Sequence, residues 1–354
     1  KYDAILSLGV LEYIENITLF LEKMVRVASN LVIVSIPKKW NILTPQRKLR
    51  YWLRGCPLYF YSKSEIKNIV NFVESVNTQT YQNIEFIVVD NYSTDGTYEY
   101  LIENNITTYQ KGPERTAQGN YGMLVKSTGK YVGYFDADMI LSPNLIGSAV
   151  HFLETNQDII ALHIRETILG KGYWSSVRRF ERSFYEGTLI DAARIFRRDI
   201  LSEVGGFDEE SFVTPSAEDW DLDKRIKEYG KISFLDDSYG NGKLNKEITT
   251  LIEESGIDCS DNFPCFYHNE KDFSFKWYID KKKYYSQSIG NYIRKWGKND
   301  IDLRKQLGFW YRYFFVFMEN GKFKKIIAHP LYFFSMYLNL FLVGITFLVY
   351  RSKK

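Results

Sequence analysis

The sequence predicts an α/β protein in which short apolar strands alternate with amphipathic helices. Hydrophobic residues fill 45% of the 354 positions, enough for a sizeable core, and the length allows two or more domains. Segments with helical spacing of apolar residues separate the runs with strand character. Those runs are residues 2–8, 31–36, 85–89 and 131–135.

Composition argues against several other classes. The net charge is only +3, so nucleic-acid binding would need a local basic patch with aromatic side chains placed to stack on bases. Residues 275–325 are basic and aromatic but match no such module, and we expect no nucleic-acid partner. Cys56, Cys259 and Cys265 form neither a disulfide framework nor two close metal-binding pairs, which favours a reducing compartment.

The first strands predict a βαβ unit, because a helix with an apolar stripe is expected at residues 17–27, between strands 2–8 and 31–36. The sequence starts at Lys1 without a methionine and enters a strand at once, so we expect the true start to lie upstream. A helix follows at residues 64–76, with Ser64 as its N-cap.

A second α/β pattern begins with the strand at 85–89, a turn at 91–96, a helix at 97–104 and the strand at 131–135. Helices and strands then alternate from 141 to 212, and Gly-Gly-Phe-Asp at 205–208 marks a turn out of a helix. The acidic stretch at 236–261 indicates an insertion or a lid.

The C-terminal region suggests membrane attachment. Residues 331–350 carry no charge and are long enough to cross a bilayer as a helix, although a buried core helix is the alternative. The preceding residues 301–330 are basic and aromatic, as suits an interfacial segment on anionic lipid. Basic residues flank the apolar stretch equally, so its orientation stays open.

Asp136 and Asp138 are the first residues that indicate chemistry, because they follow an apolar strand where it enters a loop. Two carboxylates one residue apart can approach one hard cation, Mg²⁺ or Mn²⁺. Such a cation keeps coordination positions open for phosphate oxygens, and it neutralises the negative charge on a leaving diphosphate. An Asp-x-Asp triplet alone is common, so its context decides.

That context is Asn-Ile-Glu-Phe-Ile-Val-Val-Asp-Asn-Tyr-Ser-Thr-Asp-Gly-Thr at 83–97, where an apolar strand ends in a carboxylate and a turn enters a helix. Together with Asp-Ala-Asp at 136–138, it resembles the family 2 glycosyltransferases of the GT-A fold. The resemblance extends over roughly residues 76–296. It includes Gln-Thr-Tyr-Gln-Asn at 79–83, Arg-Thr-Ala-Gln-Gly-Asn-Tyr-Gly at 115–122 and Glu-Asp-Trp-Asp-Leu at 218–222.

The resemblance implies where a nucleotide sugar would bind. Asp90 and Asn91 would face the base and ribose. Arg115 would offer its charge to the diphosphate, with a solvated helix residue as the alternative. Asp136 would lie against the ribose or the metal, and Asp138 would bind the metal directly.

The resemblance also implies the catalytic groups. Asp219 is the candidate general base that takes the proton from an acceptor hydroxyl, with Glu218 as the alternative. Asp221 and Asp223 would cap or solvate the helix that follows. His268 matches the place where this fold can return a late histidine to the metal or diphosphate, with an ordinary surface histidine as the alternative. His163 has no comparable neighbours in the sequence, and we assign it no role.

Two departures qualify this picture. The family's first strand, which ends in a Pro-x-Tyr-Asn-like turn, is missing or degenerate in this sequence. Residues 58–64 could form a substitute strand, but they lack that turn. Residues 2–13 and 31–37 instead resemble the fourth and fifth strands of a class I S-adenosylmethionine-dependent methyltransferase. Because that fold's Gly-rich loop would lie before Lys1, we expect no methyl transfer from this chain.

The predicted organisation is a partial methyltransferase-like segment at 1–70, a GT-A domain at 71–300, an interfacial segment at 301–330 and a transmembrane helix at 331–350. We expect an inverting enzyme that moves one sugar from a nucleoside-diphosphate sugar to a hydroxyl of a lipid-linked or cell-surface glycan. The Gln-x-x-Arg-Trp pattern of processive synthases is absent. Nucleotide sugars and free thiols favour the cytoplasmic face of a membrane. The rival hypothesis is a non-catalytic membrane-bound scaffold.

Overall fold

The computed structural model describes residues 2–7, 28–34, 63–93, 97–212, 217–258, 263–270 and 272–351. These residues divide into two compact units. Unit 1 contains residues 1–70 and 86–112, and unit 2 contains residues 71–85 and 113–354. Helix α3 (Lys63–Asn77) runs across the division, one residue longer at each end than predicted.

Unit 1 holds two parallel strand pairs. Strand β1 (Tyr2–Ser7) pairs with β2 (Ala28–Val34), which confirms the two N-terminal strands. The helix expected at 17–27 lies outside the described residues. Strand β3 (Ile87–Asp90) pairs in parallel with β4 (Thr107–Gln110), and helix α4 (Thr97–Glu103) lies between the two strands in the sequence.

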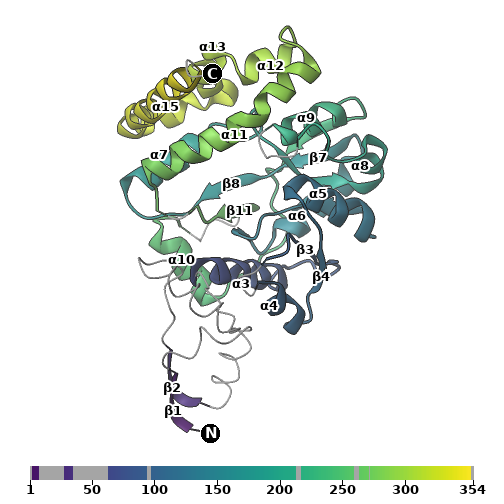
Figure 1. Ribbon diagram of the computed structural model, residues 1–354, viewed down its shortest axis with the longest axis vertical. Coiled ribbons are helices and arrows are strands. Elements are labelled where there is room, and N and C mark those ends of the chain that lie inside the picture. The colour runs from purple at the N-terminus through teal and green to yellow at the C-terminus, as the bar shows by residue number, and fades with distance from the viewer. Residues whose placement is uncertain are drawn as a thin grey trace, which may run out of the picture. The chain divides into compact units, whose positions relative to one another are not determined.

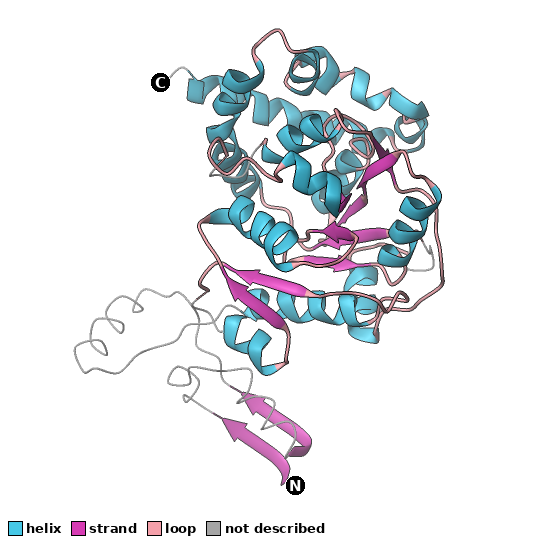
Figure 2. Cartoon of the chain, turned by 90° about the vertical axis from the view of Figure 1, so that its right-hand side faces the viewer, coloured by secondary structure: helices cyan, strands magenta, loops and turns pink. Residues whose placement is uncertain are grey.

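Unit 2 is built on a four-stranded mixed sheet with the order β10-β7-β9-β5. Strand β9 lies antiparallel to both β5 and β7, while β10 is parallel to β7. Figure 2 shows the strands with helices packed around them. The four strands are β5 (Tyr131–Gly133), β7 (Ile159–His163), β9 (Ala193–Arg197) and β10 (Lys231–Phe234).

A second sheet in unit 2 has the order β6-β11-β8. Its central strand β11 (Cys265–His268) is antiparallel to β6 (Met139–Leu141) and parallel to β8 (Arg165–Ile168). Because β6 starts directly after Asp138, this sheet brings the end of β11 to the Asp-Ala-Asp turn. Neither β6 nor β11 was predicted from the sequence.

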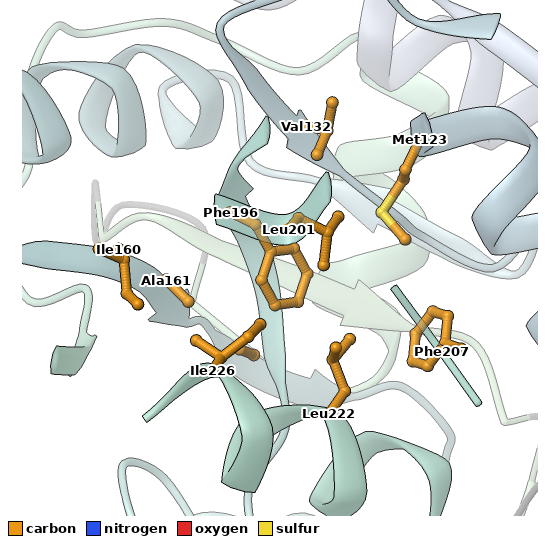
Figure 3. Close-up of a cluster of buried hydrophobic side chains, with 10 residues drawn as sticks. Met123, Val132, Ile160, Ala161, Phe196, Leu201, Phe207, Leu222 and Ile226 are labelled. Atoms are coloured by element: carbon orange, nitrogen blue, oxygen red, sulfur yellow. The ribbon is translucent and has the colours of Figure 1, made fainter. Parts of the chain in front are cut away.

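A core of buried side chains fills the space between the four-stranded sheet and its helices. Phe196, Leu201 and Leu222 are at most 1% exposed, and they point toward one another in Figure 3. Full burial of such a side chain contributes roughly 1.5–3 kcal/mol. The helices that contribute to this core are η2 (Tyr121–Lys126), α8 (Arg198–Val204) and α9 (Glu218–Ile226). Helix α5 (Glu114–Asn120) contacts η2, and α6 (Leu145–Thr155) contacts β7.

The turn predicted at 205–208 is confirmed. Helix α8 ends at Val204, and Gly205 and Gly206 both have positive φ, 80° and 68°. Helix α10 (Lys246–Glu254) falls in the stretch predicted to be an insertion or a lid. It buries Ile248 and Ile252 completely against the β6 and β11 side chains, so this helix packs into the core. The interpretation of the stretch as an insertion or a lid stays a prediction.

The C-terminal helices pack with α7 (Tyr173–Arg182), on the same side of β8 in Figure 1. Phe184, Val316, Phe317 and Met336 are fully or almost fully buried in their shared cluster. The elements are α11 (Phe275–Trp296), α12 (Ile301–Gln306), α13 (Phe309–Tyr313), η3 (Phe315–Phe317), η4 (Glu319–Gly321), α14 (Phe323–Ala328) and α15 (Pro330–Arg351).

Helix α15 covers the segment predicted to cross a membrane. Within the described part of the chain, no single helix has both the length and the apolar character of a bilayer span. The segments Glu319–Ala328 and Pro330–Gly344 meet these criteria only as a pair, and they are bent by 112° relative to each other.

Candidate active site

The Asp-Ala-Asp residues lie in the turn between β5 and β6, and β5 ends at Gly133, two residues before the predicted end of the strand. The turn is closed by the Met139 N–H, which donates to the Asp136 carbonyl at 3.0 Å. The Asn269 N–H donates to the Asp138 carbonyl at 2.8 Å, which ties the turn to the end of β11. The local turn and the backbone after β11 together fix the position of the Asp-Ala-Asp residues.

Arg115 on α5 gathers three carboxylates around one guanidinium group. Its Nη1 lies 3.4 Å from Asp136 Oδ2, and its Nη2 lies 3.5 Å from Asp219 Oδ2. Nη2 also donates to Glu218, whose side chain is only 1% exposed. The Arg-Thr-Ala and Glu-Asp-Trp motifs thus meet at the Asp-Ala-Asp turn, and Arg115 is surrounded by carboxylates of the protein.

Tyr134 holds Asp219, the candidate general base, in this cluster. Its hydroxyl donates to Asp219 Oδ1 at 2.5 Å. Burial raises the pKa of Tyr134 well above its ordinary value, so the hydroxyl keeps its proton and remains a donor. Asp219 has 17% of its side chain exposed, and it is the more accessible of the two predicted acidic residues.

Arg194 on β9 adds a buried positive charge. Its guanidinium lies 4.7 Å from the centre of the Tyr134 ring, and its Nη1 is buried without a hydrogen-bond partner among the described residues. Burial alone would raise the pKa of Asp136, but Arg115 and Arg194 together lower it. Asp136 therefore stays ionised in this cluster.

His268 lies between two carboxylates at the end of β11. Its Nε2 is 3.4 Å from Asp138 Oδ2, and its Nδ1 is 2.6 Å from Glu166 Oε1. Burial alone would lower the pKa of His268, but hydrogen bonds to Asp138 and Glu166 raise it to about 10. The surface-histidine alternative was wrong, since only 13% of this side chain is exposed.

Asp138 and His268 fit a divalent cation, which would replace the Nε2 proton of His268 on binding. Asp138 Oδ1 is buried and has no hydrogen-bond partner among the described residues, so it has an oxygen free to bind one. No group of three or more His, Cys, Asp or Glu side chains in the described part of the chain is arranged to hold a metal ion by itself. Proteins usually bind Mg²⁺ through one or two carboxylates, while substrate phosphates and water fill the other positions.

Asp90 and Asn91 lie in unit 1, where Asp90 closes its own turn. Asp90 Oδ2 accepts from the Ser93 N–H at 2.9 Å and from Gln110 Nε2 at 3.2 Å, and the residue is buried. Asn91 is exposed. Their predicted contact with the base and ribose stays a prediction.

The prediction that Asp221 and Asp223 cap or solvate a helix was wrong. Both are buried on α9, where Asp221 accepts from Arg225 Nε at 2.8 Å and from Trp296 Nε1 at 2.9 Å. Asp223 Oδ2 lies 2.9 Å from Nε2 of His163, which is also buried. These groups pair across elements and hold α9 in place.

Sequence reasoning missed Tyr134, Glu166 and Arg194. Tyr134 stands two residues before Asp136, so its position beside the turn was a usable signal. Glu166 and Arg194 had no local signal, because only the pairing of β8 with β11 and of β9 with β5 brings them to the site.

Comparison with known proteins gives a consistent family. The family described as Glycosyl transferase family 2 matches residues 60–205. The chain is 34% identical over 207 residues to UDP-Glc:alpha-D-GlcNAc-diphosphoundecaprenol beta-1,3-glucosyltransferase WfaP of Escherichia coli, covering 52% of this chain and 78% of that protein. It is 37% identical over 87 residues to Glycosyltransferase GlyG of Streptococcus pneumoniae, covering 23% and 29%. It thus spans most of the first relative and under a third of the second.

Among solved structures, the mannosyltransferase PcManGT from Pyrobaculum calidifontis, in complex with GDP-Man and Mn²⁺, is similar with a TM-score of 0.45. The two chains share 16% identity, covering 80% of this chain and 73% of that one. These comparisons do not support the methyltransferase resemblance of residues 1–70.

Proposed function

Because the chain belongs to glycosyl transferase family 2, and is therefore a glycosyltransferase, we propose that it moves one sugar from a nucleoside-diphosphate sugar to an acceptor hydroxyl with inversion. The observation that carries this proposal is the position of Asp219. Tyr134 and Arg115 hold its two carboxylate oxygens beside the Asp-Ala-Asp turn.

Asp219 is the general base of this proposal. Its carboxylate takes the proton of the acceptor hydroxyl as that oxygen bonds to the anomeric carbon. The bond between this carbon and the phosphate oxygen breaks, and its electron pair leaves with the diphosphate. A single displacement of this kind inverts the anomeric configuration. Glu218 is less suited, since it is 1% exposed and bound to Arg115.

Asp138 and His268, with Asp136 beside them, would hold the Mg²⁺ or Mn²⁺ ion. When bound, this ion neutralises negative charge on the leaving diphosphate. The buried, unpartnered Oδ1 of Asp138 supports this assignment. Arg194 would bind an anionic group of the substrate, because its Nη1 has no hydrogen-bond partner among the described residues.

A lipid-linked glycan is the proposed acceptor. The name of the Escherichia coli relative states a diphosphoundecaprenol-linked acceptor and a UDP-Glc donor. We extend the lipid-linked class to this chain and leave the donor base and sugar to experiment.

Attachment to the cytoplasmic face of a membrane completes the proposal. Helix α15 buries Met336 and Asn339, while Leu331, Phe334, Leu338 and Phe341 are 49–73% exposed. The exposed residues recur every three or four positions, so they form one apolar stripe along the helix. Such a stripe supports a helix lying in the lipid interface more than one crossing the bilayer.

Membrane binding is tested by sedimentation with vesicles that contain anionic lipid. Replacing Phe334 and Leu338 together by serine removes apolar area from the stripe and should release the protein into the supernatant. Replacing Ile301, which is 73% exposed but lies on α12, is the matched control. Equal sedimentation of all three proteins would overturn the attachment proposal.

The catalytic proposal is tested with purified protein, a panel of UDP and GDP sugars, Mn²⁺ and a lipid-diphosphate-linked glycan. Asp219→Asn should abolish transfer yet retain nucleotide binding measured by calorimetry. Asp199→Asn, a change of the same type at an exposed helix start, should transfer like the wild type. NMR of the product should show inverted anomeric configuration. Retained configuration, or an active Asp219→Asn variant, would refute the proposed mechanism.

A further inference from the structure

Glu166 has a place in the site that the proposed reaction does not yet use. Strand β8 runs parallel to β11, and Glu166 lies one strand away from His268 on the same sheet. Glu166 Oε1 is 2.6 Å from His268 Nδ1, and only 9% of the glutamate side chain is exposed. The contact is therefore a short, buried hydrogen bond directly behind the imidazole ring.

The hydrogen bond decides which ring nitrogen faces the carboxylate of the turn. With Nδ1 held by Glu166, Nε2 points to Asp138 Oδ2 at 3.4 Å. Rotation of the ring by half a turn would lose both contacts. The orientation of His268 thus depends on an acceptor at the position of Glu166.

Glu166 is itself fixed by a second layer of charges. Arg182 Nε donates to Glu166 Oε2 at 2.6 Å, so each carboxylate oxygen has its own partner. Arg182 Nη2 donates to Asp191 Oδ1 at 2.8 Å, and Asp191 accepts from the Gly187 N–H at 2.8 Å. Arg182 and Asp191 are 13% and 1% exposed, so this support is shielded from water.

We propose that Glu166 is a positioning residue that holds His268 with Nε2 toward Asp138, so that this pair receives the divalent cation. The inference rests on the metal-dependent function proposed above. Carboxylates behind metal-binding histidines orient the ring, and their loss typically weakens metal affinity about 10- to 100-fold. Glu166 itself does not touch the cation or the substrate in this assignment.

Binding of Mn²⁺ to the full chain in the presence of UDP, followed by electron paramagnetic resonance, tests the proposal without relying on turnover. Glu166→Gln should raise the Mn²⁺ dissociation constant about 10- to 100-fold. The matched control is Glu186→Gln, which alters a carboxylate that is 13% exposed and pairs with Arg165 and Lys325. It should bind Mn²⁺ like the wild type, and thermal unfolding compares the stability of both variants.

The outcomes separate the inference from the proposed function. If Asp138→Asn loses Mn²⁺ while Glu166→Gln binds it with wild-type affinity, the role of Glu166 is refuted and the metal site stands. If Glu186→Gln weakens Mn²⁺ as much as Glu166→Gln does, the effect is general and the positioning role is refuted as well. If the wild type binds no Mn²⁺ with UDP, both proposals fail.

Discussion

The Tyr134 hydroxyl donates a 2.5 Å hydrogen bond to Oδ1 of Asp219, while Arg115 Nη2 lies 3.5 Å from the other oxygen of the same carboxylate. Both partners fix the direction of the carboxylate. Tyr134 comes from the β5 end of the Asp-Ala-Asp turn, and Asp219 comes from the start of α9. This bond therefore couples the proposed base to the turn that carries the metal-binding carboxylates.

Tyr134→Phe should lower kcat with little change in donor affinity. A hydrogen bond to a charged group is worth roughly 1.5–3 kcal/mol, which corresponds to about a 10- to 100-fold loss of rate if it orients the base in the transition state. The measurement is steady-state transfer together with calorimetric donor binding. Tyr131→Phe, three residues earlier on β5 and with its hydroxyl 3.4 Å from Arg197 Nη1, is the control. A Tyr134→Phe variant with wild-type kcat would contradict this role.

Arg115→Leu should destabilise the protein by about 3–5 kcal/mol, because it leaves the buried Glu218 carboxylate without its cation. Denaturant unfolding measures this loss. Arg198→Leu is the control, since the Arg198 guanidinium donates to the neutral groups Ser127 Oγ and Leu124 O. A loss no larger than that of Arg198→Leu would mean that the Glu218 charge is not held by Arg115.

The double variant Arg115→Leu with Glu218→Gln separates stability from catalysis. Neutralising Glu218 removes the buried charge that Arg115 compensates in the wild type, so much of the stability should return. Transfer should stay low, because Asp136 and Asp219 have still lost their shared cation. Recovered activity in the double variant would show that Arg115 serves the fold and has no part in organising the site.

The fold was predictable where a local pattern marks each element. The apolar run before Asp90, the helix from Thr97 and the turn at Gly205 are confirmed, because strand periodicity, turn residues and glycine each act locally. With the family match, the GT-A-like α/β fold is supported as well. The roles assigned to the site residues stay predictions, although the structure brings Arg115 next to Asp136 and Asp219.

What the sequence could not provide is pairing between distant strands. The three residues of β6 are too few for a periodic signal, and β11 follows the acidic stretch that was interpreted as an insertion or a lid. Without that sheet, Glu166 had no predicted partner. The acidic residues of α9 were predicted to be solvated because their partners on other elements could not be inferred. Polarity alone predicts exposure, but Asp221 is buried because Arg225 and Trp296 meet it from two different helices.

Glu270→Gln should lower stability in a pH-dependent way. Burial alone would raise the pKa of Glu270, but Arg178 and Lys281 lower it from 4.5 to about 2. A carboxyl group with a lowered folded-state pKa stabilises the fold above its unfolded pKa and loses this effect as pH falls through the folded value. The free energy of unfolding of the wild type should therefore exceed that of the variant by roughly 3 kcal/mol at neutral pH. This difference should disappear as the pH falls from about 4.5 to 2.

Denaturant unfolding at several pH values measures that gap. Glu254→Gln is the control, because Glu254 is 51% exposed and its partner Lys171 is 57% exposed, so the pair should contribute little at any pH. A gap between wild type and Glu270→Gln that is the same at pH 7 and pH 2.5 would show that the ion pairs do not account for the stability.

Gly206→Ala should be more damaging than Gly205→Ala, although both glycines have positive φ. A Cβ at Gly205 meets no atom within 4 Å, so Gly205→Ala should cost only the backbone strain of about 1–2 kcal/mol. A Cβ at Gly206 would lie 2.2 Å from Asn120 Oδ1, the atom that accepts from the Phe207 N–H at 2.7 Å. Overpacking should add roughly 1–3 kcal/mol, measured by urea unfolding, and equal losses in the two variants would mean that Asn120 moves aside without cost.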